Sequence, residues 1–124
     1  MFNFSKKDKK APKNFKEVLA LLKKLEDGFD NISQELEKIK EDNKLSIKKV
    51  GIVRFNPFAE VGGDQSFSIA LLDGEDSGIV ITSHYIREGN RVYGKPIKKG
   101  SSNYSLSAEE KEAINKAKSI ENER

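Results

Sequence analysis

A chain of 124 residues without cysteine holds one modest domain and an extension, and it excludes disulfides, a thiol nucleophile and a cysteine metal site. No apolar stretch reaches the roughly 18 residues that span a bilayer, and no secretory signal is visible, so we expect a cytoplasmic protein. The net charge of +3 is uneven, because five lysines against Asp8 give residues 1–14 a charge of +4. The rest of the chain is therefore slightly acidic, which makes a nucleic-acid-binding fold unlikely.

Residues 1–13 are predicted to be a disordered basic tail that ends near Pro12. An alternative hypothesis is that this tail binds an anionic membrane surface peripherally, because each lysine near such a surface contributes about 1 kcal/mol. The membrane contacts would be two phenylalanines and four lysines: Phe2, Phe4, Lys6, Lys7, Lys9 and Lys10.

Residues 14–44 are predicted to form a coiled-coil helix with Asn14 as its N-cap. Apolar side chains recur in alternating steps of three and four residues, which keeps one seam on the same side of a supercoiled helix. The seam residues are Phe15, Val18, Leu22, Leu25, Phe29, Ile32, Leu36 and Ile39. So narrow a seam is buried only against another helix, and we expect a homo-oligomer whose copy number and helix orientation stay open. The alternative is a monomer whose helix folds back on the sheet, for which a broader apolar stripe is typical.

Residues 45–124 are predicted to form a small α+β domain. The expected strands are Val50–Phe55, Phe67–Leu72, Ile79–Arg87 and Arg91–Ile97, with a two-residue turn at Gly89-Asn90 between the last two. The apolar run from Ile69 to Leu72 indicates a strand buried on both faces. Ser107 and Glu110 form a capping box that opens a final helix. The fold class is therefore α+β: an N-terminal coiled-coil helix, a mostly antiparallel four-stranded sheet and a C-terminal helix packed on it.

Two segments of this domain are distinctive. The first reads VGIVRFNPF from Val50 to Phe58, and the second reads VGGDQSFSIALLD from Val61 to Asp73. With Gly78-Ile79-Val80-Ile81 and Lys95-Pro96-Ile97, they resemble the bacterial family catalogued as domain of unknown function 4446. The resemblance covers roughly residues 48–117. It implies a coiled coil followed by this small domain, often with a transmembrane helix in front, and it implies no established activity.

A cationic set offers a candidate ligand site. With the predicted turn, Glu88 faces Arg91, Ile86 faces Tyr93 and His84 faces Lys95. Strand alternation then places His84, Arg91, Tyr93 and Lys95 on one face, and Arg87 on the other. A phosphate or carboxylate group would suit either Arg54 or the pair of Arg91 and Lys95 beside Tyr93. The alternative is an ordinary salt-bridged sheet face.

The glycines before Asp64 suggest two further interpretations, a backbone nest for an anion or a loop that needs positive φ with Asp64 capping its turn. One histidine and no cysteine make a metal site improbable, and no residue pair indicates catalysis, so we expect neither a metal, a cofactor nor an enzyme. The first functional hypothesis is a scaffold or adaptor that oligomerises through the coil and binds a protein partner through the α+β domain. The second is a sensor of a small anionic or nucleotide-like ligand.

Overall fold

The computed structural model describes residues 11–57 and 65–120, and the chain divides into two compact units, Met1–Asp42 and Asn43–Arg124. The first unit contains all but the last two residues of helix α1, Phe15–Lys44. Its first turn is capped as predicted, because the Asn14 side chain accepts a hydrogen bond from the Glu17 amide at 2.8 Å. The Glu17 carboxylate in turn accepts a hydrogen bond from the Lys13 amide.

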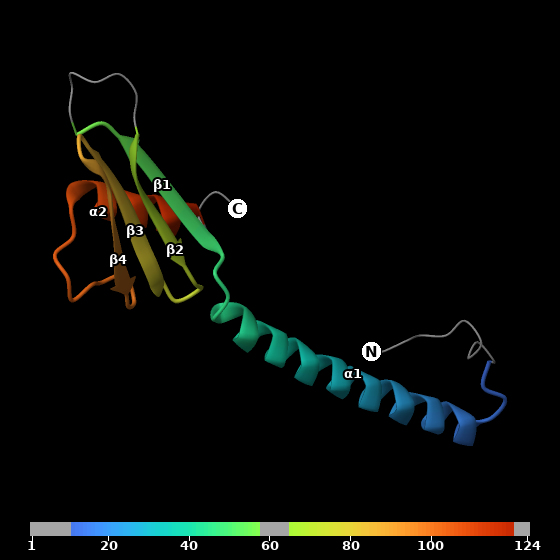
Figure 1. Cartoon of the computed structure of the whole chain (residues 1–124). Helices are drawn as coiled ribbons and strands as arrows, with labels where there is room; N and C mark the ends of the chain where they lie inside the picture. Colours follow the sequence, from blue (N-terminus) through green and yellow to red (C-terminus); the bar gives the residue numbers. More distant parts are fainter. Residues whose placement is uncertain (1–10, 58–64, 121–124) are drawn as a thin grey trace. The chain divides into compact units, whose positions relative to one another are not determined.

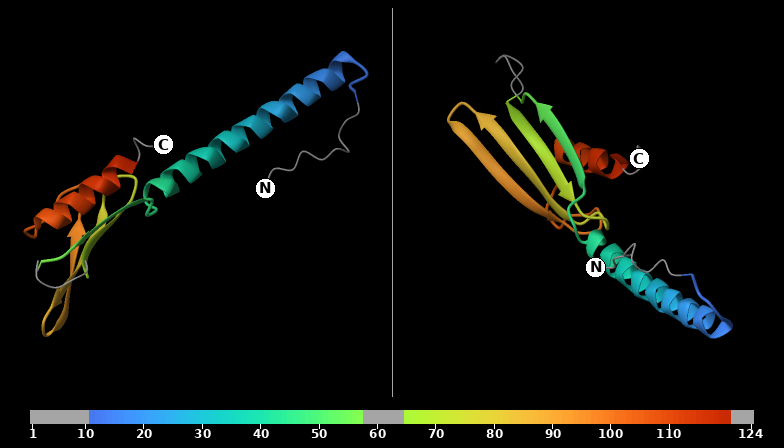
Figure 2. Two further views of the ribbon diagram at one scale, coloured as in Figure 1. Left: turned by 90° about the horizontal axis from the view of Figure 1, so that it is seen from above. Right: turned by 90° about the vertical axis from the view of Figure 1, so that its right-hand side faces the viewer.

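The second unit is a four-stranded antiparallel sheet with one helix on one of its faces (Figures 1 and 2). Its elements are β1 (Lys49–Phe55), β2 (Ser66–Leu72), β3 (Gly78–Ile86), β4 (Gly89–Ile97) and α2 (Ala108–Ser119). The strands follow one another in sequence order across the sheet, and α2 contacts mainly β1 and β2. The predicted α+β fold class, with its long N-terminal helix, antiparallel sheet and packed C-terminal helix, is confirmed.

The predicted hairpin turn between β3 and β4 is wrong. The two turn residues are Arg87 and Glu88, and Ile86 pairs with Gly89 at the start of β4. Gly89 is the residue that follows the turn. Its φ of 131° is a conformation that favours glycine, which accounts for a glycine at this position. The hydrophobic pattern alone does not detect this error, because a shift by an even number of residues leaves every side chain on its predicted face.

The core lies between α2 and the face of the sheet that it covers. Buried side chains of all four strands pack there against the small residues of the helix. The cluster consists of Val53, Ala70, Leu72, Val80, Ile97, Ala113, Ile114 and Ala117. The expected burial of β2 on both faces is not found: Ala70 and Leu72 are buried, whereas Ile69 and Leu71 are half-buried, because α2 covers only one side. Within the described segments, no helix is long and apolar enough to cross a membrane.

The close approach of α2 to the sheet depends on Gly51 in β1. A Cβ atom at this position would lie 2.1 Å from the Ala113 carbonyl oxygen and 2.6 Å from the Ala117 amide nitrogen. Both are backbone atoms of α2, so no rotamer change relieves the clash. Glycine at position 51 therefore sets the distance between the two layers of the core.

We expect Gly51→Ala to lower the free energy of unfolding by about 2–3 kcal/mol, because the helix must move away from a packed core. Urea unfolding followed by circular dichroism, at a fixed chain concentration, measures the change. An unchanged unfolding midpoint would show that α2 adjusts without cost and would contradict the close packing inferred here.

Candidate functional site: the uncovered face of the sheet

Lys95, one of the predicted ligand-binding residues, belongs to a polar network at the edge of the core. Its Nζ atom lies 2.7 Å from Glu110 Oε1 and 2.7 Å from the Ser105 carbonyl oxygen. Thr82 donates a hydrogen bond to Glu110 Oε2 at 2.8 Å, and the hydroxyl oxygens of Ser68 and Thr82 are hydrogen-bonded at 2.7 Å. Since Glu110 is only 2% exposed, this pairing neutralises the charge of a buried carboxylate.

The same carboxylate completes the predicted capping box of α2, which is confirmed. The Ser107 amide donates to Glu110 Oε1 at 2.8 Å, and the Glu110 amide donates to the Ser107 hydroxyl at 3.1 Å. Burial acts to raise the pKa of Glu110, but the hydrogen bonds from Lys95, the Ser107 amide and Thr82, with the positive charge of Lys95, lower it below its ordinary value. Glu110 is therefore held ionised.

Glu110→Ala should lower the free energy of unfolding by about 3 kcal/mol, because it removes one partner of a buried ion pair and opens the helix cap. A matched control is Glu112→Ala on the same helix, whose carboxylate is exposed and lies 3.7 Å from Lys116. That control should cost less than about 0.5 kcal/mol. Similar losses in both variants, measured by urea unfolding, would contradict a special role for Glu110.

The lowered pKa of Glu110 predicts a specific pH dependence. The carboxylate contributes its full stabilisation above the pKa of an unfolded glutamate, about 4.3, and this contribution is lost as the pH falls through the lower folded pKa. Glu110→Gln removes the titration and keeps a side chain suited to the capping box. We expect the stability difference between wild type and this variant to be large at pH 7 and to shrink steadily below pH 4. A constant difference would contradict the prediction.

The other predicted ligand residues are not gathered into one site. His84 pairs with Arg91 across β3 and β4, and its ring packs edge-on against Phe55 with centroids 5.4 Å apart. Tyr93 pairs with Thr82 on the same face as Lys95. The strand register places Arg54 on the opposite face of the sheet, beside Phe67.

The remaining predicted contacts lie outside the described residues. These are Asp64 and the proposed membrane contacts Phe2, Phe4, Lys6, Lys7, Lys9 and Lys10. Among the residues that the structure does describe, no group of three His, Cys, Asp or Glu side chains is placed to hold a metal ion.

The side of the sheet away from α2, here called the open face, is built from three cross-strand rows. One row contains Val50, Leu71, Ile79 and Pro96; the next contains Ile52, Ile69, Ile81 and Gly94; the third contains Arg54, Phe67, Ser83 and Val92. Apart from Arg54, Ser83 and Gly94, every position in these rows carries an apolar side chain. Ile52 is 49% exposed and Val92 is 66% exposed. A contiguous apolar face of this kind is typical of an interaction surface.

The open face has the character expected of a core, while the covered face contains the ionised network of Lys95 and Glu110. Isoleucine, leucine, valine and phenylalanine form most of the open face, and a single charged side chain, Arg54, lies at its corner. Apolar side chains at these positions are best satisfied by another apolar surface rather than by a small polar ligand. Apart from Arg54 and Ser83, the face therefore lacks the polar groups that would recognise a small polar ligand.

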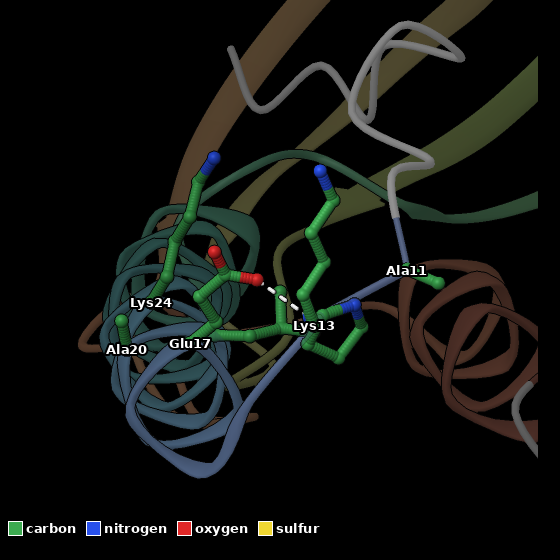
Figure 3. A pocket seen from close by; sticks show the side chains of 7 residues that line it. Ala11, Lys13, Glu17, Ala20 and Lys24 are labelled. Atoms are coloured by element: carbon green, nitrogen blue, oxygen red, sulfur yellow. Dashed lines mark hydrogen bonds between the residues drawn. The ribbon is translucent and has the colours of Figure 1, made fainter.

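Two shallow depressions elsewhere are less suited to a function. One lies beside the end of β4 and is lined by Pro96, Lys98, Lys99, Ser101, Asn103 and Tyr104. The amides of Lys99, Gly100 and Ser101 already donate to other groups, which leaves none of these three amides for an anion. The other lies at the start of α1, and its lining includes Ala11, Ala20 and Lys24. In it the Glu17 carboxylate accepts a hydrogen bond from the Lys13 amide (Figure 3). Its polar contact is part of the helix cap.

The chain belongs to the family described as protein of unknown function (DUF4446), whose model matches residues 1–118. The match includes the N-terminal helix as well as the sheet domain from which the resemblance was first recognised. No curated protein and no solved structure matches the chain.

Sequence reasoning missed the open face as a site. The pattern that could have revealed it is present: Val50 and Ile52 alternate with Gly51 and Val53, so both faces of β1 are apolar. That pattern indicates two covered faces, whereas the predicted elements include only one helix to cover them. The shortage of covering elements was the available signal.

Proposed function

We propose that this chain is a non-enzymatic assembly protein, which oligomerises through α1 and binds a protein partner through the open face of its α+β domain. The observation that carries the proposal is the exposure of all eight seam side chains of α1, which ranges from 36% for Val18 to 76% for Phe15. They repeat with the heptad spacing of a coiled coil, whose helices bury such a seam against one another.

The open face supports the second part of the proposal. An apolar surface that is left uncovered on a small domain favours association. Lys95 is already paired with Glu110, and this pairing leaves it unsuited to recognise an anionic ligand. The predicted pair of Arg91 and Lys95 is thereby reduced to Arg91, and Arg54 lies on the opposite face of the sheet. The sensor hypothesis therefore has less support than the assembly hypothesis.

We expect Ile32→Asp, at a seam position, to convert the oligomer into monomers at tens of micromolar, because it places a charge inside the helix contact. Gln34→Asp is the matched control, since it introduces the same charge at a position outside the seam. Light scattering coupled to size-exclusion chromatography gives the mass of wild type and both variants. A monomeric wild type, or equal dissociation of both variants, would contradict the proposal.

A further inference from the structure

Gly94 leaves a hollow in the open face that the fold itself does not require. A Cβ atom at this position would lie 3.5 Å from Ile79 Cδ1, which is an ordinary contact, and Gly94 does not have a positive φ. A larger residue would therefore fit the isolated domain, in contrast to Gly51. Glycine inside a strand often marks a bulge, a tight bend, or a place where a ligand or another backbone approaches closely. Neither a positive φ nor a close contact within the domain accounts for this glycine.

The counterpart of the hollow lies at the other end of the same cross-strand row. Ile52 on edge strand β1 protrudes, with 49% of its surface exposed, and Gly94 lies on the opposite edge strand, β4. A two-fold axis within the face, parallel to the strands and between β2 and β3, brings β1 of one copy over β4 of the other. Ile52 then faces the hollow at Gly94, and the contact occurs twice in a symmetric pair.

We propose that the open face is covered by the open face of a second copy of this chain, with Ile52 of each copy inserted over Gly94 of the other. The same rotation brings Ile69 opposite Ile81 in the centre, as in two aligned sheets that pack about 10 Å apart. It also brings Arg54 opposite Val92, so the two arginines do not meet. An unrelated partner would not require this match of protrusion and hollow within one row.

The size of the face explains why the pairing depends on α1. Four strands about 4.8 Å apart and three rows roughly 7 Å apart cover on the order of 400 Å². A stable interface buries about 800 Å² on each partner, so the open face alone gives weak association. The inference therefore rests on the proposed function, and it identifies the protein partner of the open face as a second copy of this chain. Helices joined through the seam would raise the effective concentration of the domains to about the millimolar range.

The test uses the absence of cysteine from the chain. The full-length double variant Ile52→Cys/Gly94→Cys is treated with a short bismaleimide. The reagent should join two packed faces about 10 Å apart but should not span β1 to β4 of one chain, a distance of roughly 14 Å. We expect at least five-fold more covalent dimer than in either single-cysteine variant. In those variants the two cysteines of a pair, one from each copy, lie on opposite edges of the interface. Equal cross-linking in all three would overturn the proposal.

Light scattering on the same samples separates this inference from the proposed function. An even number of chains with selective cross-linking supports both. An oligomer without selective cross-linking overturns the pairing of the faces and leaves the coiled coil intact. A monomer overturns both, and an odd number of chains overturns the pairing because one face is left uncovered.

A size exchange provides an independent test if the cysteine variants do not fold. Gly94→Val fills the hollow opposite Ile52, and we expect it to increase the fluorescence of an apolar dye at least three-fold as the faces separate. Adding Ile52→Ala removes the opposing protrusion, and the double variant should return to within about two-fold of wild type. No rescue in the double variant, with a far-ultraviolet circular dichroism spectrum unchanged from wild type, would overturn the contact between the two copies.

Discussion

The carboxylate of Glu110 joins the helix of the domain to its sheet. One oxygen receives the Ser107 amide, which closes the first turn of α2, and also the ammonium group of Lys95 from β4. The other oxygen receives the hydroxyl of Thr82 from β3. A helix start that is normally stabilised by water and its own cap is therefore fixed in position by two strands. The core around it can remain small, because these hydrogen bonds set the direction of α2 and its position against the sheet.

The domain departs from the usual distribution of polar and apolar residues, because it carries a buried ionised network in the covered layer and an apolar surface on the open face. Ionised and hydroxyl-bearing side chains lie between the layers beside the aliphatic core, where their hydrogen bonds are complete among the described residues, and further aliphatic side chains lie on the open face. A domain that functioned alone would gain more by placing its aliphatic residues in the covered layer. The distribution is consistent with a domain whose second apolar layer comes from another molecule.

Much of the fold was predictable from local signals. The strand alternation, the cap at Asn14 and the box formed by Ser107 and Glu110 each act within a few residues, and each was found in its predicted place. The turn before Gly89 was not predicted correctly, because the sequence does not distinguish a glycine that follows a turn from a glycine within it.

The candidate site was less accessible to sequence reasoning. Whether Lys95 meets a ligand or Glu110 depends on the packing of a helix that follows it by more than ten residues, and no short motif records that contact. The uncovered face was indicated in the sequence by the apolar residues on both sides of β1, but that signal has to be compared with the number of elements available to cover the sheet. Residue pattern identified which side chains share a face, and tertiary packing decided which face was covered.

Pro96 has a consequence for how sheets of this kind can grow. It lies on the outer strand β4 and has no backbone N–H, so a further strand added along that edge would lack one bond of its ladder. Edge-to-edge addition is the route by which sheets extend into fibres, because each added strand presents a new edge. A proline on the edge strand interrupts this route. Packing of two faces, in contrast, buries both surfaces and leaves none for a third copy. The domain can thus carry exposed aliphatic residues while its edge resists open-ended polymerisation.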